Sequence, residues 1–331
     1  MLTKGAPIDT ENIPGRITGP LPVVGTWIAP GHLLRRAQRV HTTVWNSTFG
    51  AELTGPQYAT LLAIAMWPES DQQTAGEIAG LDKATMAGVL KRLETRGFIG
   101  RTLAKDDRRR RTLLLTSEAE ERMDNFTARA LAVHESLTAK LPAGAEAEMI
   151  LLLTQVACRG EPSRIAGTVP RGYEVLEPSE ALGYLLRRAQ QIHAALWNEE
   201  FHGEITSPQY AVLSAVALAD SADQLTISDL AGLDPSSTGA VMARMEKDGW
   251  LRRETDAQDR RRLQIALTQP ARLATRWASP GVERVQMKLL KPLSAPQRER
   301  LVELLQCLVR ESDVTAPQDK THEHRVTIDA D

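Results

Sequence analysis

The chain has 331 residues, of which only two are cysteines, and its formal net charge is −2. That length is enough for about two domains, and so few cysteines argue against a disulfide-stapled secreted scaffold and for a reducing cytosol. No apolar run approaches the ~20 residues that a membrane span needs, and the start lacks a secretory pattern. Because aromatic residues make up only 4% of the chain, the core must consist mostly of Leu, Ala, Val and Ile.

The first part of the chain predicts an extension followed by two helices. Residues 1–30 are rich in Pro and Gly, with a short apolar group at 21–27, of which Val23 to Trp27 are expected to dock on the folded protein. Apolar residues recur at helical spacing over 32–49, which predicts a helix. Gly55-Pro56 opens a second helix, predicted over 55–66.

Two further helices are predicted within residues 74–97. Thr74 and Glu77 have the spacing of a capping box, which indicates a helix start at that point. Asp82 can cap the next helix, because its carboxylate accepts amides of the first turn, and Gly97 can end it in the left-handed conformation. One face of that helix is apolar and therefore predicted to be buried; it consists of Met86, Val89, Leu90 and Leu93.

A hairpin with a positively charged tip is predicted directly afterwards. Residues 98–103 read as a strand and 113–115 as its return, with the tip Lys105-Asp-Asp-Arg-Arg-Arg-Arg111 between them. A second helix with small polar residues beside such a tip suits double-stranded DNA, because the helix fits the major groove and an arginine fits the narrow minor groove. The alternative is a solvated, Arg-rich turn beside an ordinary helix pair.

The same stretch occurs a second time at residues 226–268, displaced by 152 positions without a gap. Thr226 and Asp229 repeat the capping box, and Asp234 repeats the N-cap. Pro235 then stands at the first helical position, where its missing N–H costs nothing. The repetition makes it much less reasonable to interpret the first copy as a solvated, Arg-rich turn beside an ordinary helix pair.

Duplication is the simplest origin of the chain, since residues 185–217 match 33–65 at 19 of 33 positions. One departure is Pro280, which should kink or split the long helix after the second hairpin. The predicted organisation is an N-terminal extension (1–30), a first domain (31–158), a linker (159–180), a second domain (181–312) and a disordered tail (313–331).

Each copy resembles the winged-helix core of the multiple-antibiotic-resistance regulator (MarR) family. In the first copy the resemblance is carried by Leu53-Thr54-Gly-Pro-Gln57, Leu93-Glu94-Thr-Arg-Gly97, Arg101, Asp107-Arg-Arg109 and Leu115-Thr116. In the second it is carried by Thr206-Ser-Pro-Gln209, Met245-Glu246-Lys-Asp-Gly249, Arg253, Asp259-Arg-Arg261 and Leu267-Thr268. The resemblance implies a mainly α fold with small β wings, in which two winged helix–turn–helix domains are related by a pseudo-twofold and joined by their first and last helices. The departure is fusion, because the family usually has one unit per chain and works as a homodimer.

The resemblance also implies a function. It indicates a sequence-specific regulator of transcription, expected to be a repressor, that binds a double-stranded DNA operator in the bacterial cytoplasm. A covalent pseudo-dimer would face successive major grooves about 34 Å apart on an imperfect palindrome; a homodimer of the chain is the other assembly. No catalytic residue, metal or cofactor is expected, because the sequence has no Gly-rich phosphate loop, metal-ligand cluster or nucleophile elbow.

The residues expected to contact DNA come from the second helix and the wing of each copy. In the first copy they are Lys83, Ala84, Thr85, Ala87, Gly88, Lys91, Arg101, Arg108, Arg109 and Arg110. In the second they are Ser236, Ser237, Gly239, Arg253, Arg260, Arg261 and Arg262. Because the two helix faces differ at matched positions, the two half-sites are expected to differ.

The family often senses small aromatic or phenolic acids in a pocket between the dimer helices and the DNA module. The candidates here are Arg35, His41, Trp45 and Tyr58, with their repeats Arg187, His193, Trp197 and Tyr210. An Arg or His beside aromatic rings can hold a small aromatic or carboxylate effector. The two histidines can alternatively stack on each other across the pseudo-dyad as a pH-sensitive contact. The remaining alternative is that all these residues only pack helices.

Two other kinds of regulator stay open. An architectural DNA-binding protein would bind without sequence preference and without response to a ligand. A thiol redox sensor would use Cys158 or Cys307, although a buried structural thiol is the commoner role for such residues. His322 and His324 in the tail can at most bind a metal weakly.

Overall fold

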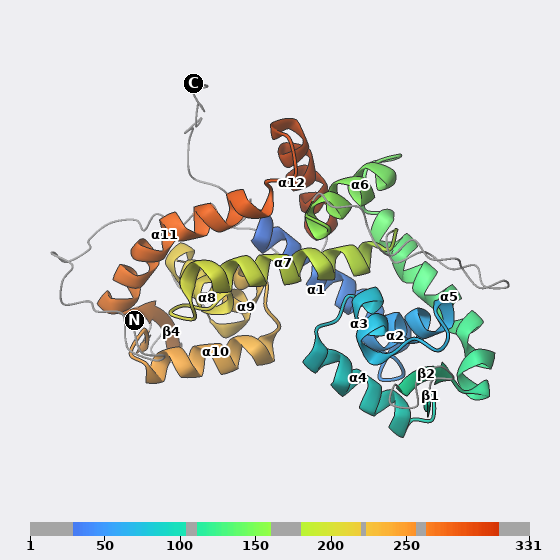
Figure 1. Cartoon of the computed structure of the whole chain (residues 1–331). Helices are drawn as coiled ribbons and strands as arrows, with labels where there is room; N and C mark the ends of the chain where they lie inside the picture. Colours follow the sequence, from blue (N-terminus) through green and yellow to red (C-terminus); the bar gives the residue numbers. More distant parts are fainter. Residues whose placement is uncertain (1–28, 104–110, 160–179, 220–222, 256–262, 311–331) are drawn as a thin grey trace.

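The computed structural model describes residues 29–103, 111–159, 180–219, 223–255 and 263–310 (Figure 1). The elements of the first copy are α1 (Pro30–Phe49), α2 (Gly55–Met66), α3 (Gln72–Ala79), α4 (Lys83–Thr95), β1 (Ile99–Leu103), β2 (Arg111–Leu115), α5 (Ser117–Thr138) and α6 (Glu146–Ala157). Those of the second are α7 (Leu182–Phe201), α8 (Ser207–Leu218), α9 (Gln224–Ala231), α10 (Pro235–Lys247), β3 (Leu251–Thr255), β4 (Leu263–Leu267), α11 (Gln269–Leu289) and α12 (Ala295–Val309). The predicted fold class, mainly α with small β wings, is confirmed. The apolar group at 21–27, the body of the linker and the C-terminal tail lie outside the described residues.

Each hairpin is a two-stranded antiparallel sheet. In the first copy Ile99 pairs with Leu115, and in the second Leu251 pairs with Leu267, so the registers are equivalent. The segment between the strands, which carries the arginine-rich tip in both copies, is not among the described residues. The hairpins therefore have the predicted place, directly after the second helix of each helix–turn–helix.

The N-caps predicted for the second helices are confirmed. The Asp82 carboxylate accepts the backbone N–H of Ala84 and Thr85, at 3.0 and 2.9 Å. Asp234 accepts that of Ser237 at 2.9 Å. These bonds satisfy amides that the helix itself cannot pair. They hold the start of α4 and α10 at the exposed end where DNA contacts are expected.

The capping boxes predicted at Thr74 and Thr226 are wrong. α3 and α9 begin two residues earlier than those threonines, with Asp71 and Asp223 as N-caps. The aspartate carboxylates accept the N–H of Thr74 and Thr226, each at 2.8 Å. An extended aspartate three residues upstream meets the same need as the predicted hydroxyl, and it comes first along the chain.

Capping boxes do occur one helix earlier. The Thr54 amide donates to Gln57 Oε1 at 2.8 Å, and the Thr54 hydroxyl accepts the Gln57 amide at 3.4 Å. Thr206 and Gln209 form the same pair in the second copy. The Thr-x-x-Gln part of the family motif therefore has a structural purpose, which is to start α2 and α8.

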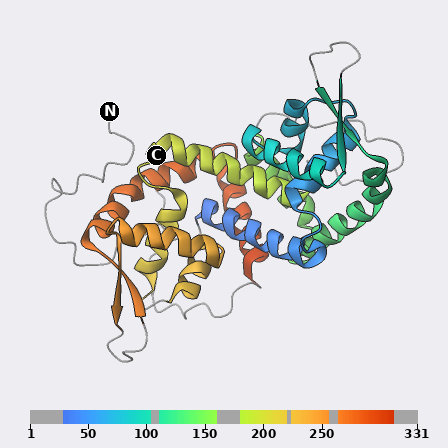
Figure 2. The ribbon, with the colours of Figure 1, turned by 90° about the horizontal axis from the view of Figure 1, so that it is seen from below.

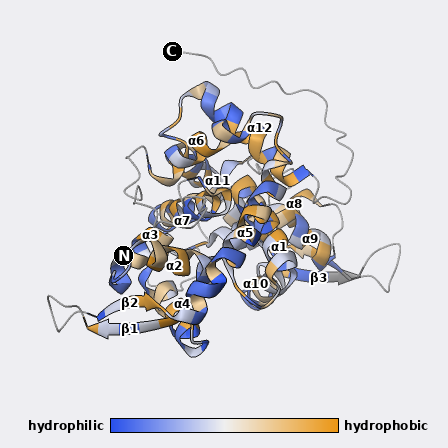
Figure 3. Cartoon of the chain, turned by 90° about the vertical axis from the view of Figure 1, so that its right-hand side faces the viewer, coloured by the Kyte–Doolittle hydropathy of each residue, from blue (hydrophilic) through white to orange (hydrophobic). Residues whose placement is uncertain are grey.

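The two copies are joined through their first and last helices. α1 packs against α7 and α12, and α7 packs against α1 and α6, while α6 and α12 lie side by side at one end of the molecule (Figure 3). The leucines at this junction belong to one continuous core and are at most 2% exposed; they are Leu33, Leu34, Leu152, Leu153, Leu185, Leu186, Leu304 and Leu305. The exchange of terminal helices between copies matches the predicted pseudo-twofold arrangement.

Of the two outcomes predicted for Pro280, a split is excluded because α11 runs unbroken from Gln269 to Leu289, and a kink stays a prediction. The Ser279 hydroxyl donates to the Thr275 carbonyl at 3.0 Å, next to the Arg276 carbonyl that loses its helical partner because Pro280 has no N–H. Gly281 then lies against Phe201, whose ring carbons would be 2.8 Å from a Cβ atom there. The Pro-Gly pair thus allows α11 to approach α7 closely.

Both recognition helices lie on the same side of the molecule. α4 and α10 are on the face opposite α6 and α12 (Figure 1), and the view from that face shows the two hairpins projecting in opposite directions (Figure 2). Among the described residues, no helix is both long and apolar enough to cross a membrane. The fold therefore presents two DNA modules on one face of a single helical frame.

Candidate nucleic-acid interface and effector pockets

The side chains predicted for DNA contact on α4 face solvent. Lys83, Ala84, Thr85, Ala87 and Lys91 are exposed, and Gly88 is half-buried. The opposite face of α4 is buried as the periodicity predicted, with Met86, Val89, Leu90 and Leu93 at most 1% exposed.

The corresponding face of α10 is built in the same way but carries less charge. Ser236 and Ser237 are exposed and Gly239 is half-buried. At the positions of Lys83 and Lys91, the second copy has Pro235 and Ala243. Lys247 at the end of α10 stands where α4 has Thr95, so α4 carries three basic residues and α10 carries two.

One arginine in each helix face was missed by sequence reasoning. Arg92 and the equivalent Arg244 are exposed on the same side as the predicted residues. Arg92 Nη2 would lie 3.8 Å from a Cβ atom at Gly88, so its guanidinium reaches back along the exposed face. The signal in the sequence was the spacing of four from the small residue, which brings both positions to one side of a helix.

Arg101 and Arg253 have the same partner in the two copies. Arg101 Nε donates to the Glu94 carboxylate, and Arg253 Nε donates to that of Glu246 at 2.9 Å. Each pair joins the first strand of the hairpin to the recognition helix. These two arginines are thus placed to hold the wing against the helix, whereas Arg108, Arg109 and Arg110 and their equivalents Arg260, Arg261 and Arg262 lie outside the described residues.

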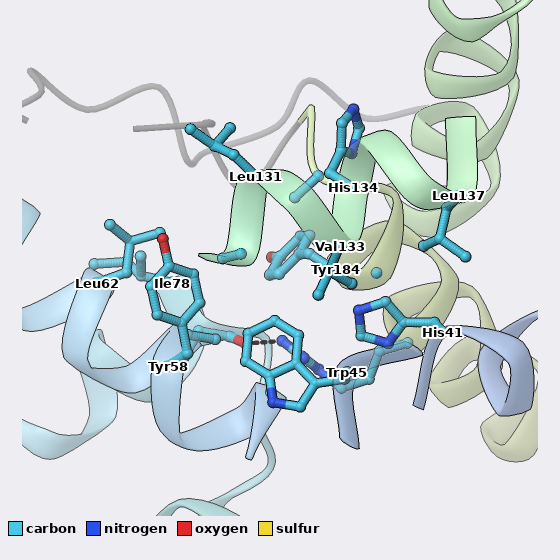
Figure 4. A pocket seen from close by; sticks show the side chains of 17 residues that line it. His41, Trp45, Tyr58, Leu62, Ile78, Leu131, Val133, His134, Leu137 and Tyr184 are labelled. Carbon is cyan, nitrogen blue, oxygen red and sulfur yellow. Dashed lines mark hydrogen bonds between the residues drawn. The ribbon is translucent and has the colours of Figure 1, made fainter. Parts of the chain in front are cut away.

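Two pockets lie at the junction of the copies. The first pocket, of about 70 Å³, is lined by His41, Trp45 and Tyr58 (Figure 4). The second pocket, of about 30 Å³, is lined by their repeats His193, Trp197 and Tyr210. The structure therefore brings each predicted histidine, tryptophan and tyrosine together.

The predicted arginines are exchanged between the pockets. Arg187 of the second copy lines the first pocket, and Arg35 of the first copy lines the second. Grouping Arg35 with His41 because both lie on α1 was wrong. Six residues correspond to about 600° of rotation, so the two side chains leave the helix in different directions. Each pocket consequently needs residues from both copies.

The indole of each tryptophan already has a backbone partner. Trp45 Nε1 donates to the Leu53 carbonyl at 2.6 Å, and Trp197 Nε1 donates to that of Ile205 at 2.8 Å. Trp45 and Tyr58 have ring centres 5.7 Å apart. The tryptophans therefore form fixed walls, and polar contact with a ligand must come from other groups.

The expectation that His41 and His193 stack on each other is wrong. Each ring lies against the glycine near the start of the opposing helix, since a Cβ atom at Gly183 would overlap His41 and one at Gly31 would overlap His193. Burial lowers the pKa of His41 to about 4, with smaller contributions from Arg187 and His134. Burial and Arg35 lower the pKa of His193 to about 3. Both imidazoles are therefore neutral near pH 7, which also corrects the expected titration near neutrality.

The first pocket contains one charged group. Burial lowers the pKa of Arg187 to about 10, so the guanidinium remains charged at neutral pH. Its Nη2 donates to the Ala79 carbonyl at 2.7 Å, while its Nε and the Tyr184 hydroxyl are buried without a partner among the described residues. None of the described residues that line this pocket is a carboxylate. Its electrostatics favour an anion.

The other candidate chemistries gain no support from the described residues. Cys158 and Cys307 are free thiols, each half-buried. Within those residues no group of three or more His, Cys, Asp or Glu side chains is arranged to hold a metal ion.

Two helix–turn–helix units, each followed by an antiparallel hairpin, define the chain as a protein of the winged-helix class. Family models described as "MarR family" match residues 51–110 and 205–263. The chain belongs to the MarR family and carries two of its units in tandem. It is a transcriptional regulator of that DNA-binding family, and the relatives that it matches are regulators and not enzymes.

Three comparisons illustrate the relationship. The transcriptional regulator HosA of Escherichia coli O157:H7 is 35% identical over 120 residues, which are 36% of this chain and 88% of HosA. The HTH-type transcriptional repressor NicR of Pseudomonas putida is 28% identical over 127 residues, covering 38% of this chain and 80% of NicR. The crystal structure of PcaV from Streptomyces coelicolor with its natural ligand has 36% identity and a TM-score of 0.40, covering 43% of this chain and all of that one.

Proposed function

We propose that this chain is a repressor that binds an imperfect palindrome of double-stranded DNA as a covalent pseudo-dimer and leaves it when a small aromatic or phenolic acid binds. The observation that carries the proposal is the exchange of terminal helices within one chain, which leaves α4 and α10 on one face. A repressor role is supported by the name of the relative NicR.

The two recognition helices differ at exposed positions, which supports an imperfect palindrome. Thr85 and Ala87 on α4 correspond to Ser237 and Gly239 on α10, and side chains at these exposed positions are the ones that can reach base edges. Lys83 and Lys91 of α4 have no basic equivalents at the matched positions of α10, so phosphate contacts from these positions occur on one side only. A different half-site for each copy follows.

The wings supply the second part of the proposed interface. Arg109 and Arg261 stand at the Asp-x-Arg positions, for which the family resemblance implies minor-groove contacts. Replacing each arginine by alanine should weaken specific binding by roughly 1–3 kcal/mol. The two losses should be unequal because the half-sites differ.

The effector is proposed to act through the junction of the copies. The first pocket is lined by α1, α2 and α5 of the first copy, by α7 of the second, and also by Ile78 and Ala79 of α3. A ligand there touches the helix that precedes the recognition helix. Suppose that the ligand binds only the conformation with misplaced recognition helices. The ligand then lowers the affinity of the protein for its operator by the same factor by which the operator lowers the affinity of the protein for the ligand. A coupling free energy of about 1–3 kcal/mol is typical.

The DNA part is tested by selecting binding sites from random duplexes and measuring operator affinity by fluorescence anisotropy. Exchanging Thr85 and Ala87 for Ser and Gly should alter the preference at one half-site only. The same effect at both half-sites, or at neither, would contradict the asymmetric assignment. Unchanged affinity of the Arg109→Ala, Arg261→Ala double variant would remove the wings from the interface.

The effector part is tested with a thermal-shift screen of phenolic and aromatic acids, followed by titration of the protein–operator complex. Compounds that raise the melting temperature of the protein should cause the protein to release the operator. Stabilisation without release would refute the coupling. Binding that shows neither sequence preference nor response to any compound would favour an architectural DNA-binding protein.

A further inference from the structure

The two pockets are built from matched residues but differ in their polar contacts. We infer that the chain has a single effector site, the first pocket, which takes one aromatic carboxylate, and that the second pocket is closed by its own side chains. This inference rests on the proposed function, in which an effector acts at the junction of the copies.

The arginine of the second pocket donates to the protein from both of its terminal nitrogens. Arg35 Nη2 donates to the Ser207 hydroxyl, and its Nη1 donates to the Ala231 carbonyl at 3.3 Å. A ligand carboxylate would have to displace the serine to reach this guanidinium. The Ser207 hydroxyl therefore occupies the position on Arg35 that a ligand carboxylate would need.

A glutamine closes the other side of the second pocket. Gln286 Oε1 accepts the backbone N–H of Gly31 at 2.8 Å, and Gln286 Nε2 lies 3.4 Å from His193 Nε2. The Gly31 amide belongs to the first turn of α1, where amides are free to bind an anion. The glutamine occupies this amide and fills the space in front of it.

Both closing residues are absent from the first pocket. The chain has Gly55 at the position of Ser207, and His134 at the position of Gln286. His134 turns its Nε2 to the Glu146 carboxylate, at 2.7 Å, and among the described residues its side chain makes no hydrogen bond to the first turn of α7. Neither α1 nor α7 has a side-chain cap at its N-cap residue, so the difference among the described residues is the Gln286 side chain on the Gly31 amide. The first pocket is also the larger of the two, at about 70 against about 30 Å³.

The groups left over in the first pocket converge on one kind of ligand. Besides the uncapped start of α7, Arg187 Nε and the Tyr184 hydroxyl are buried without partners among the described residues, and the Tyr184 side chain is only 8% exposed. A carboxylate can accept hydrogen bonds from both groups and from the helix start. Apart from His41 and His134, the rest of the lining is aromatic or apolar, contributed mainly by Trp45, Tyr58, Leu62, Ile78, Val133 and Leu137. Those walls fit a single aromatic ring.

A single site predicts one ligand per chain and a simple binding curve. The test is isothermal titration calorimetry on the full chain, with benzoate and its three monohydroxy derivatives as probes. At least one probe should bind with a stoichiometry of one. The Gly55→Ser variant supplies Arg187 with the hydroxyl that Arg35 has, and should weaken binding roughly tenfold or more. A Cβ atom at Gly55 has its nearest neighbour at 3.8 Å, so this variant can keep the fold.

The matched variant opens the second pocket. Ser207→Gly combined with Gln286→His should raise the stoichiometry from one to two while the first site keeps its affinity. A stoichiometry of two for the unaltered chain, no binding of any probe, or unchanged affinity in folded Gly55→Ser protein would each overturn the inference. Operator affinity of the same preparations, measured by anisotropy, separates the two proposals. A probe that binds once but leaves the operator bound supports the single site and refutes release by the effector.

Discussion

The Arg187 guanidinium donates to the carbonyl of Ala79 at a distance of 2.7 Å, which ties the first helix of the second copy to the last residue of α3 in the first. The equivalent bond from Arg35 to Ala231 is longer, at 3.3 Å. α4 begins only four residues after Ala79. The orientation of each recognition helix therefore depends on an arginine supplied by the other copy.

Replacing Arg187 by methionine should loosen α3 and α4 of the first copy. The variant removes a charged donor from a buried carbonyl, a change that typically costs about 1–3 kcal/mol. Hydrogen exchange measured by mass spectrometry should become faster in α3 and α4 but not in α9 and α10. Arg188→Met is the matched comparison, because among the described residues that side chain packs against Gly80 but donates its hydrogen bond to Gln191 in its own helix, at 2.9 Å. Equal exchange in the two variants would contradict the coupling.

Acidification should destabilise the protein through its buried histidines. His41 and His193 have pKa values lowered to about 4 and about 3, and burial lowers the pKa of His32 in the same direction. As the pH falls below 6.5, the unfolded chain takes up protons that the folded chain does not, so stability is lost with falling pH. The loss between pH 7.5 and 5.5 should be about 1 kcal/mol per histidine.

The measurement is urea unfolding at the two pH values. Glu52 and Glu200 have pKa values lowered from 4.5, so their contribution is lost only at lower pH and does not enter this window. The His41→Gln, His193→Gln variant should show a smaller difference between pH 7.5 and 5.5. An unchanged difference would show that these rings do not titrate as their burial requires.

Local features of the fold were predictable from the sequence, and contacts between the copies were not. The Asp82 and Asp234 caps and the buried face of α4 depend on residues within one or two turns, where spacing decides the outcome. The pairing of Arg187 with the first pocket depends on how α1 crosses α7, which no local pattern encodes. The predictions for the N-caps of α3 and α9 failed for a different reason. Both a threonine and an aspartate three residues upstream were available as N-caps, and the aspartate formed the bond.

A methyl group at the two junction glycines should disturb the packing of the copies. Alanine at Gly183 would overlap the His41 ring, and alanine at Gly31 would overlap that of His193. Each change should lower the free energy of unfolding by about 1–3 kcal/mol. Gly88→Ala is the control, because its nearest neighbour is a flexible Arg92 atom at 3.8 Å, and alanine in a helix is favoured by roughly 0.5–1 kcal/mol. Urea unfolding measures the three free energies of unfolding, and equal values for the three variants would contradict the account.

The charge difference between the recognition helices should appear in the salt dependence of DNA binding. Lys91 is exposed on α4, and its equivalent on α10 is Ala243. Lys91→Ala should reduce the slope of log K against log salt concentration by about one, and Ala243→Lys should increase it by a similar amount. Anisotropy titrations at four or more KCl concentrations give the slopes. Identical slopes for the two variants and the unaltered chain would exclude Lys91 from phosphate contact.

The composition of the operator complex tests the pseudo-dimer most directly. Native mass spectrometry of the complex formed on a selected operator, checked by sedimentation velocity, counts the chains on one duplex. The account predicts one chain of 36.4 kDa per duplex carrying both half-sites, with binding lost when either half-site is scrambled. Two chains per duplex, each contributing one DNA module, would contradict it.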